Sequence, residues 1–288
     1  MTATLPTAPA SQYDRVASAS SAVVIQGYST SFGWACRLLA EPVRSQVRNV
    51  YALVRLADEV VDEPFDAWTT DQRRAVLDRL EADTYDAMRT GRSANLVVHA
   101  FAGTANRAGI GADLVRPFFA SMRTDLSVRV HDRESFTAYV YGSAEVVGLM
   151  CLRVFTGGDD AQYDRLAPAA SRLGAAFQKL NFLRDIAEDH GVRGRRYFPD
   201  LDPDGFTDRE RDAILADIDE DLAAAASALP HLPPSSRRGV AAAHALFTEL
   251  AGRLRATPAS RIRAERVRVP GPVKAAVVAR TVLAGGRG

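Results

Sequence analysis

Four aspartates in two identical spacings are the residues of this chain best placed to do chemistry. Asp58 and Asp62 form one Asp-x-x-x-Asp motif, and Asp185 and Asp189 form a second, each within a stretch of helical period. Each residue turns a helix by about 100°, so the two carboxylates of a motif lie about 40° apart on one face. Two such faces brought together would make an acidic cleft that requires cations. Magnesium binds a few carboxylates and completes its shell with water and phosphate oxygens, so the pattern predicts a metal site for a phosphorylated substrate.

The first motif lies in a narrow polar stripe on an otherwise apolar helix. Tyr51 and Arg55 fall within about 60° of Asp58 on the helical wheel, on the side where Asp62 lies. Most of the remaining circumference is Leu, Val and Ala. A single stripe of this kind also fits a solvated helix face, with Arg55 as an ordinary i, i+3 partner of Asp58. Its interpretation therefore depends on the second motif.

The second motif adds further oxygen donors to the same helix face. Gln178, Asn181, Asp185 and Asp189 recur at helical spacing, and Gly174 at the N-terminal end of the stripe leaves room. Amide side chains are a poor choice for a purely solvated stripe, but they are good oxygen donors to Mg²⁺ or to its bound water. The two stripes together favour a metal–phosphate cleft over two solvated faces.

A basic loop follows the second motif directly. Residues 191–199 contain three arginines, Arg193, Arg195 and Arg196, loosened by glycines. Guanidinium groups match phosphate oxygens in a bidentate manner. In isolation such a run is equally well explained as a solvated loop, but its position beside the acidic motif predicts a phosphate clamp.

Composition excludes several classes of function. The 288 residues include 36 Lys and Arg against 35 Asp and Glu, so no overall field attracts nucleic acid, and none is expected as a partner. The five histidines form no His-x-x-x-His pair, which argues against zinc. Cys36 and Cys151 stand among apolar residues and are expected to be reduced core residues of a cytoplasmic protein.

Helical periodicity runs through nearly the whole chain, and alternating strand patterns are absent from the sequence. Helices are expected near residues 21–40, 43–63, 71–90, 93–109, 111–125, 133–155, 160–189, 207–228, 235–256 and 270–284. Asp71, Ser93 and Asp132 are the expected N-caps of three of them. The sequence thus predicts one all-α domain over residues 21–288, preceded by a flexible leader over residues 1–20. No window of 18 residues is both apolar and uncharged, so any membrane contact is expected to be peripheral.

At these motifs the chain resembles the squalene/phytoene synthase family, the head-to-head prenyl transferases. The resemblance runs from about residue 21 to the basic stretch at residues 263–268, and its second acidic block is the most specific part. Both acidic blocks are more similar to the phytoene synthase branch than to eukaryotic squalene synthases. The matching residues are 28–32 (Tyr-Ser-Thr-Ser-Phe), Tyr51, Arg55, Asp58, Asp62, 139–150, Gln178, Asn181, Arg184, Asp185, Asp189, Arg195, Tyr197 and Pro199.

The resemblance implies an all-α isoprenoid-synthase bundle around a central cavity, with diphosphate sites at the cavity mouth. It implies two sets of ligands for Mg²⁺, or Mn²⁺ in its place: Asp58 and Asp62 in one set, and Asn181, Asp185 and Asp189 in the other. Tyr139 resembles a cavity tyrosine near the reacting carbons, so it joins the four aspartates as a candidate catalytic residue. The implied diphosphate contacts are Ser29, Ser31, Tyr51, Arg55, Gln178, Arg184, Arg195 and Arg266.

The implied activity is the head-to-head condensation of two geranylgeranyl diphosphates, through a cyclopropyl diphosphate, to phytoene in carotenoid biosynthesis. No NADPH is expected. The same chemistry on farnesyl diphosphate, giving dehydrosqualene or squalene, stays open because cavity length decides between them. A non-catalytic scaffold of the same fold, and a head-to-tail synthase or terpene cyclase, are further alternatives.

The chain departs from the family pattern at two positions, and it contains one candidate segment for membrane contact. Thr30 stands where the family has Lys, and Phe247 stands where Tyr is common, which removes a positive charge and a hydroxyl. Because prenyl diphosphates are amphiphilic, peripheral contact with a membrane is expected. Residues 267–283 interleave Arg and Lys with Val and are the candidate segment, although a terminal helix packed on the core explains the same pattern.

Overall fold

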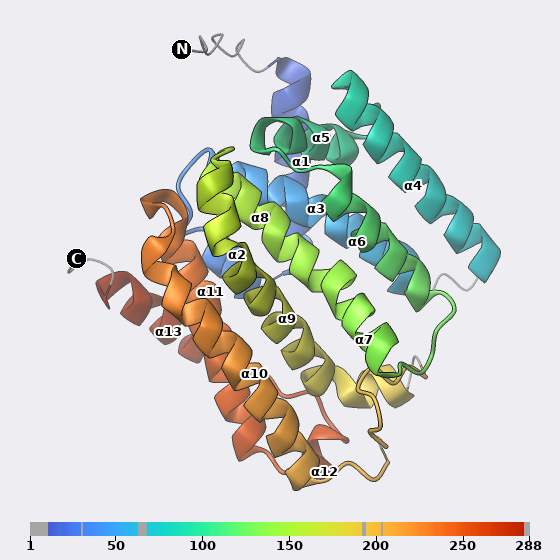
Figure 1. The fold of residues 1–288 in the computed structure, drawn as a ribbon, viewed down its shortest axis with the longest axis vertical. Coiled ribbons are helices and arrows are strands. Elements are labelled where there is room, and N and C mark those ends of the chain that lie inside the picture. The colour runs from blue at the N-terminus through green and yellow to red at the C-terminus, as the bar shows by residue number, and fades with distance from the viewer. Residues whose placement is uncertain (1–10, 30, 63–67, 192–193, 203, 285–288) are drawn as a thin grey trace.

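A computed structural model describes residues 11–29, 31–62, 68–191, 194–202 and 204–284 (Figure 1). In chain order the elements are α1 (Gln12–Tyr28), α2 (Ser31–Cys36), α3 (Val43–Asp62), α4 (Thr70–Thr90), α5 (Leu96–Ala108), α6 (Ala112–Asp125), α7 (Arg133–Val140), η1 (Tyr141–Glu145), α8 (Val146–Thr156), α9 (Asp160–Gly191), α10 (Asp208–Ala228), η2 (Leu229–His231), α11 (Pro234–Ala256), α12 (Ala259–Ile262) and α13 (Gly271–Ala284). Within the described part of the chain, the only strand-like pairing is one isolated bridge between Val130 and Arg196. The predicted all-α class is therefore confirmed.

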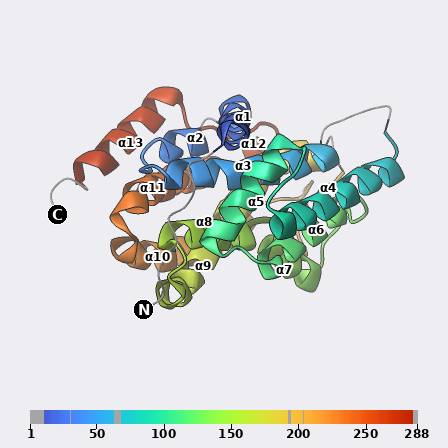
Figure 2. The same ribbon diagram turned by 90° about the horizontal axis from the view of Figure 1, so that it is seen from above.

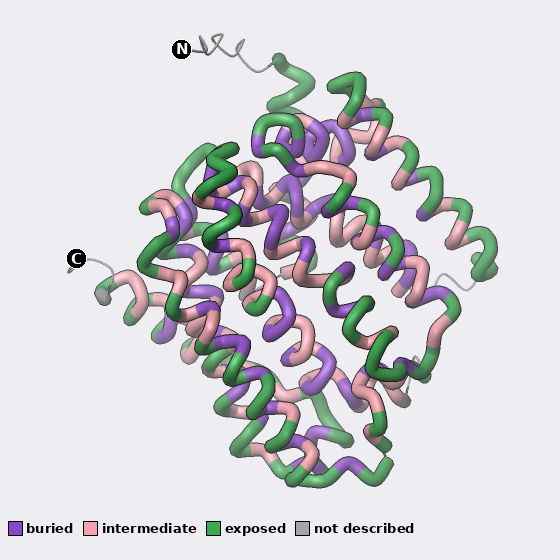
Figure 3. Tube along the Cα trace, in the orientation of Figure 1, coloured by how far each residue is buried: buried purple, intermediate pink, exposed green. Residues whose placement is uncertain are grey.

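Two helices in the middle of the array, α8 and α9, join the others into one packed body (Figures 1 and 2). On one side, α3 packs against α1, α5 and α8, and α6 also packs against α8. On the other side, α9 packs against α10, and α11 contacts α10, α13 and α2. Buried residues follow the same division, with a larger core cluster from α1 to the start of α9 and a second one on α9 to α12 (Figure 3). Since α8 contacts both α3 and α9, it connects the helices that carry the two aspartate motifs.

Helix N-termini are set by side chains that accept hydrogen bonds from the first free N–H groups. Asp132 caps α7, as predicted. The other two predictions are wrong by two residues: Thr69 caps α4 instead of Asp71, and Asn95 caps α5 instead of Ser93. In each case the true cap already has extended backbone, whereas Asp71 lies inside the first turn of its helix.

The N-terminal helix begins earlier than expected. Ser11 and Asp14 form a reciprocal capping box, which starts α1 at Gln12. Residues 12–20, which were expected to belong to the flexible leader, are therefore helical, and the helix expected over residues 21–40 is divided into α1 and α2. Residues 1–10 of the predicted leader lie outside the described part of the chain.

The apolar helix expected over residues 133–155 is continuous, but its hydrogen bonding changes at the π-helical turn η1. Close packing surrounds this turn. A Cβ on Gly142 would lie 2.3 Å from the carbonyl oxygen of Pro117, and one on Gly148 would lie 2.8 Å from that of Ala170. By length and composition Arg133–Thr156 passes as a membrane span, but its packing against α6 and α9 is that of a core helix.

Candidate functional site

The first aspartate motif occupies the last turns of α3. The apolar face of α3 lies in the core, so Asp58 and Asp62 remain on the half-buried side of the helix. Nη1 of Arg55 donates to Oδ2 of Asp58 at 2.6 Å, and Nη2 of the same guanidinium contacts Glu59. One arginine thus serves two carboxylates, so it compensates the charge of Asp58 only in part.

The electrostatics of Asp58 show this deficit. Burial raises the pKa of its carboxyl to about 7, the charge of Asp62 adds to the rise, and the nearby Arg55 opposes it without cancelling it. A carboxylate pair in this condition binds a cation favourably, because the cation replaces the missing compensation. The Asp58 side chain is still 31% exposed, so an ion can reach it from solvent.

The chain after α1 covers the same helix. The guanidinium carbon of Arg55 lies 4.5 Å from the ring centroid of Tyr28, in a cation–π contact. Phe32 stacks on Tyr51 with ring centroids 5.5 Å apart. Burial raises the pKa of Tyr51, against the effects of Arg55 and of a hydrogen bond with Ser29. The structure therefore brings together Ser29, Tyr51 and Arg55, three of the predicted diphosphate contacts.

Two predictions in this segment fall outside what the structure describes. They concern the side chain of Ser31 and the whole of Thr30. The diphosphate contact of Ser31, and the effect of having threonine at position 30, stay predictions.

Asp185 of the second motif is neutralised more completely than Asp58 of the first. Nε and Nη2 of Arg184 donate to the two carboxylate oxygens of Asp185 at 2.8 and 2.5 Å. Nε of Arg266 lies 2.8 Å from Oδ1 of Asp185, and its Nη1 lies 3.9 Å from Glu188. One carboxylate is thus held between two guanidinium forks. Arg266, which is remote in sequence, therefore contacts the second motif, and its contact with diphosphate stays a prediction.

The remaining oxygen donors of the second motif lie along the same uninterrupted helix. α9 runs without a break through this region, so the predicted spacing holds. Gln178 and Asn181 are half-buried, whereas Asp189 is only 6% exposed. Close approach of helices explains Gly174, since a Cβ there would lie 2.6 Å from the carbonyl oxygen of Ala144. The room that Gly174 leaves is filled by the neighbouring backbone.

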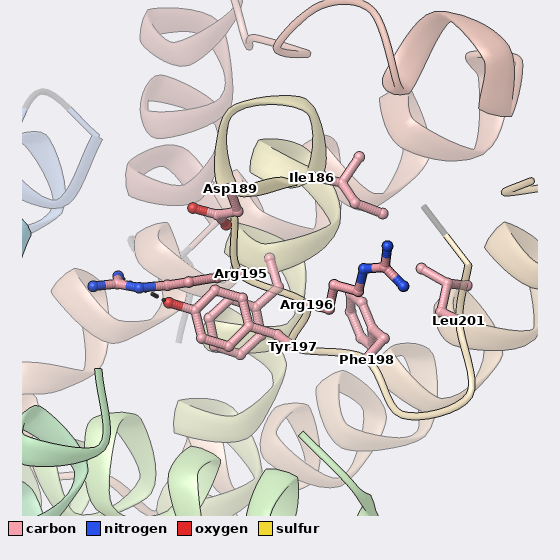
Figure 4. A pocket seen from close by; sticks show the side chains of 8 residues that line it. Ile186, Asp189, Arg195, Arg196, Tyr197, Phe198 and Leu201 are labelled. Atoms are coloured by element: carbon pink, nitrogen blue, oxygen red, sulfur yellow. Dashed lines mark hydrogen bonds between the residues drawn. The ribbon is translucent and has the colours of Figure 1, made fainter. Parts of the chain in front are cut away.

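Arg195 connects the ends of the two motifs, and Figure 4 shows it beside Asp189 and Tyr197. Its Nη1 donates to Oδ1 of Asp62 at 2.6 Å, and its backbone N–H donates to the carbonyl of Asp189 at 2.8 Å. Nη1 also lies 3.2 Å from the hydroxyl of Tyr197. With 5% of its surface exposed, Arg195 is an internal partner of Asp62 in this structure, and its contact with diphosphate stays a prediction. Arg193 lies outside the described residues.

Behind Arg195 lies a buried polar cluster that sequence reasoning missed. Asp125, the last residue of α6, accepts hydrogen bonds from the hydroxyls of Tyr139 at 2.6 Å and Tyr197 at 3.2 Å. Burial raises the pKa of Asp125 to about 6, although Arg195 opposes the rise. The only trace in the sequence is an acidic residue at the end of an amphipathic helix, which does not indicate partners 14 and 72 residues away.

Two hollows border the second motif. The smaller one, about 270 Å³ including space open to solvent, is lined by Asp189, Arg195, Tyr197 and mostly apolar neighbours (Figure 4). The larger one, about 910 Å³ including space open to solvent, is formed by α9, α11 and the chain leading into α13. We call it the basic hollow, because it combines four cationic with five apolar residues: Arg184, Arg266, Arg268 and Lys274, with Leu246, Phe247, Leu250, Val267 and Val269.

The departure at position 247 lies inside the basic hollow. Phe247 stacks on Phe177 with ring centroids 3.7 Å apart and planes 13° apart. The wall at this point is apolar and offers no hydroxyl. Any anion held here is therefore bound by the guanidinium and ammonium groups around it.

The donor set can be tested against magnesium. Within the described ranges, no group of three or more His, Cys, Asp or Glu side chains converges closely enough to hold a metal ion alone. The donors are all oxygen and come as pairs on two helices, and Asp58 lacks full compensation. Mg²⁺ accepts this arrangement, because it takes one or two carboxylates and fills its other positions with water and phosphate oxygens. The residues fit a metal that binds together with a diphosphate.

Comparison with known proteins agrees with this geometry. The squalene/phytoene synthase family profile matches residues 25–272. The phytoene synthase of Pseudescherichia vulneris is 29% identical over 253 residues, which are 81% of this chain and 80% of that protein. Phytoene synthase 1 of Zea mays is 31% identical over 192 residues, 65% of this chain and 46% of the plant protein. The chain thus spans about half the length of that plant relative.

Solved structures extend the likeness to three dimensions. A dehydrosqualene synthase bound to a ligand superposes with a TM-score of 0.81 at 20% identity, covering 96% of this chain and 98% of the other. A squalene synthase from Alicyclobacillus acidocaldarius gives 0.74 at 19% identity, covering 90% and 98%. At these identities the likeness establishes the helical isoprenoid-synthase fold. With that fold, and with a family profile that covers most of its length, the chain belongs to the squalene/phytoene synthase family.

Proposed function

We propose that this protein condenses two molecules of geranylgeranyl diphosphate head to head, through a cyclopropyl diphosphate, to phytoene. The observation that carries the proposal is the pair of aspartate motifs, which meet at Arg195 and lie beside a basic hollow. This combination provides for a metal and for an anion at one place. The choice of the C20 substrate rests on the phytoene synthases among the relatives.

The basic hollow is the proposed diphosphate site. Burial and the charges of Arg184 and Arg268 lower the pKa of Arg266, and burial followed by the same two charges lowers the pKa of Lys274. Cations that disfavour one another's charge are stabilised when an anion enters between them. Arg184 and Arg266 also contact Asp185, so one pair of guanidinium groups can reach both the carboxylate and a bound diphosphate.

Five residues would hold magnesium or manganese: Asp58, Asp62, Asn181, Asp185 and Asp189. The metal, when bound, supplies positive charge that stabilises the departing diphosphate. The residues of the chain supply the rest. Arg184, Arg266 and Arg55 bind diphosphate oxygens, and the apolar side chains of the hollow keep water from the allylic cation that ionisation leaves. The double bond of the second substrate then attacks this cation, and loss of a proton closes the cyclopropane ring.

The runner-up is the same chemistry on farnesyl diphosphate, as the names of the structural neighbours suggest for those proteins. A non-catalytic scaffold is disfavoured, because all five metal-type side chains and the cations of the basic hollow are retained.

Product analysis tests the proposal. The protein is incubated with geranylgeranyl diphosphate, farnesyl diphosphate or an equimolar mixture, in Mg²⁺ and without NADPH, and the hydrocarbons are identified by mass spectrometry. We expect phytoene from the C20 substrate and from the mixture. A mixture that yields mainly dehydrosqualene or squalene assigns the runner-up, and no hydrocarbon from any arm contradicts prenyl transfer.

We also propose peripheral contact with a membrane through α13. Val277 anchors this helix to the core, while Leu283 is 71% exposed and Arg280 is exposed. An apolar tip beside a cation fits an anionic lipid surface. Sedimentation with anionic liposomes should fall for the double variant Arg280→Glu/Leu283→Glu and stay unchanged for Arg89→Glu on the exposed face of α4. Equal sedimentation of all three proteins would remove α13 from the proposal.

A further inference from the structure

Asp125 is a buried carboxylate with no assigned role, and it sits next to the proposed cavity tyrosine. It is 4% exposed at the C-terminus of α6, where the chain turns toward His131. A carboxylate in this position is costly unless donors surround it. The donors are the hydroxyls of Tyr139 and Tyr197, with Arg195 Nη1 3.7 Å from Oδ1.

The two hydrogen bonds on Asp125 are not equivalent. Tyr139 donates to Oδ2 at 2.6 Å, the shorter bond, whereas Tyr197 donates to Oδ1 at 3.2 Å. Tyr197 also has Arg195 Nη1 3.2 Å from its hydroxyl. Tyr139 therefore depends on the Asp125 carboxylate more than Tyr197 does.

The ring of Tyr139 is fixed as firmly as its hydroxyl. Its centroid lies 5.1 Å from that of His131, 5.3 Å from Tyr197 and 5.9 Å from Phe182. Phe182 in turn stacks on Tyr197 at 3.9 Å. Aromatic rings on these sides prevent the phenol from swinging. Its hydroxyl is held by the short bond to Asp125 and also interacts with the hydroxyl of Tyr197.

The number of protons on a phenol then decides what Tyr139 can do. An ionised carboxylate only accepts, and a phenol has a single proton to donate. With that proton given to Asp125, the Tyr139 oxygen can only accept from any third group. It cannot donate to a diphosphate oxygen, but its lone pairs can stabilise positive charge, and the bond to a carboxylate makes the oxygen more electron-rich.

We propose that Asp125 is a positioning residue that commits the Tyr139 proton to α6 and so leaves the Tyr139 oxygen only lone pairs with which to stabilise positive charge on the hydrocarbon. The inference rests on the proposed prenyl transfer and adds to it the orientation of this hydroxyl. It separates Tyr139 from the diphosphate contacts and gives the Asp125 carboxylate a role in the rate of the reaction.

The main test is the isosteric variant Asp125→Asn. Because Arg195 Nη1 lies near Oδ1, the amide oxygen stays on that side and the NH₂ group turns toward Tyr139. The amide then donates where the carboxylate accepted, and the phenol loses its orientation. Arg195 keeps its bond of 3.1 Å to the backbone carbonyl of residue 125, which the substitution leaves in place.

We expect Asp125→Asn to lower kcat by about 100-fold, as for loss of a group that stabilises charge in the transition state, with KM changed by less than about threefold. Tyr139→Phe should lower kcat to a similar extent, and the double variant should lose no more than either single one, because both remove the same interaction. Wild-type kcat in Asp125→Asn, or losses that multiply in the double variant, would overturn the proposal.

A matched control separates positioning from a merely structural role. Asp221 is another buried aspartate, 1% exposed on α10, where it binds Lys179 and Arg172. Asp221→Asn should lower the melting temperature and leave kcat per folded molecule unchanged, and its effects should simply add to those of Tyr139→Phe. An equal loss of kcat in Asp221→Asn would show that any buried aspartate matters and would remove the special role of Asp125.

A second measurement does not require Asp125→Asn to fold. In proton NMR spectra, a phenol bound to a carboxylate gives a hydroxyl signal far downfield. This signal should persist in Tyr197→Phe and vanish in Tyr139→Phe, and its absence from the wild type would refute the hydrogen bond. Failure of the wild type to convert any prenyl diphosphate refutes the proposed function and the positioning role with it. Wild-type conversion with an unaffected Asp125→Asn variant refutes positioning alone.

Discussion

The two aspartate motifs have the same spacing, but their first aspartates, Asp58 and Asp185, have different electrostatic surroundings. On α3, Asp58 shares a single arginine with Glu59, and burial raises its pKa to about 7. On α9, Asp185 lies between the guanidinium groups of Arg184 and Arg266. Although Asp62 is paired with Arg195, Asp58 therefore lacks positive charge, while Asp185 already holds it.

This difference separates two requirements that a diphosphate-processing site has to meet. A motif without enough compensation gains most from an added cation. A motif paired with arginines can release those arginines to an anion while a metal takes over the carboxylate. We therefore expect α3 to be the part of the site most dependent on metal, and α9 with the basic hollow to be the part most dependent on diphosphate.

Removal of divalent ions should have the largest effect, because both halves of the site need them. Exhaustive treatment with EDTA should abolish product formation, and Mg²⁺ or Mn²⁺ should restore it, since the donor set is oxygen only. Radiolabelled product is measured before and after each addition. A chelator selective for zinc serves as the control and should leave activity unchanged. Robust turnover in EDTA would mean that the aspartates are not metal ligands.

The variants Asp58→Asn and Asp185→Asn should differ in stability although both lose activity. Each should lower kcat by more than about 100-fold. In the absence of metal, Asp58→Asn should be as stable as the wild type or more so, since it relieves repulsion by Asp62. Asp185→Asn should lose about 1–2 kcal/mol, because two guanidinium groups lose a charged acceptor.

Chemical denaturation without metal measures this difference in stability between Asp58→Asn and Asp185→Asn. If both variants change stability in the same direction by the same amount, the two motifs are electrostatically equivalent and the comparison fails. If either variant retains nearly full activity in saturating Mg²⁺, its assignment as a ligand is wrong.

The helices, the two acidic faces and the family follow from the sequence, because each depends on local period and spacing. Arg266 was predicted as a diphosphate contact, but its pairing with Asp185 was not, since the two residues are 81 apart and nothing local connects them. The capping box at Ser11 is a local signal that is present in the sequence, and attention to it would have placed the start of α1 correctly.

The cluster around Asp125 could not be predicted in this way. Its hydrogen bonds join the end of α6, the helix α7 and the chain after α9, and the partners share no spacing that a period would detect. Arg195 was assigned to a phosphate clamp because its basic run directly follows the acidic motif. Its burial depends on tertiary contacts with Asp62 and Tyr197. Buried polar clusters are satisfied across the fold, so they are visible only once the fold is known.

The variant Arg266→Gln tests whether the basic hollow beside Asp185 binds the diphosphate. It removes one of the two guanidinium groups on Asp185, and with it a proposed contact to the diphosphate. KM for the prenyl diphosphate should therefore rise by about tenfold, which corresponds to the loss of one charged hydrogen bond, with a smaller change in kcat. Arg261→Gln, an exposed neighbour that pairs only locally with Glu265, is the matched control and should leave KM unchanged. An unchanged KM in Arg266→Gln would exclude the hollow as a diphosphate site.

The smallest expected effect is the pH dependence of the stability of the metal-free protein in EDTA. The raised pKa of Asp58 determines whether stability rises or falls with pH. The folded state binds the Asp58 proton more tightly than the unfolded state, because the pKa is raised from 3.8 to about 7. Stability is therefore lost as the pH rises from about 4 to about 7, and Asn at this position removes that loss. The raised pKa of Asp125 acts in the same direction, and the charge of Asp125 also contributes to the raised pKa of Asp58.

Melting temperatures of the wild type and Asp58→Asn should thus agree near pH 4 and separate toward pH 8, with the variant more stable there. Because the Asp58 side chain is 31% exposed and contacts Arg55, solvent and the ion pair weaken the effect. We expect a separation of roughly 2–4 °C, which corresponds to about 1 kcal/mol in a protein of this size. Asp185→Asn, whose carboxylate is paired twice, should show no such gain at high pH. Parallel curves for wild type and Asp58→Asn would mean that α3 does not lack positive charge, and the contrast between the two motifs would then rest on Arg184 and Arg266 alone.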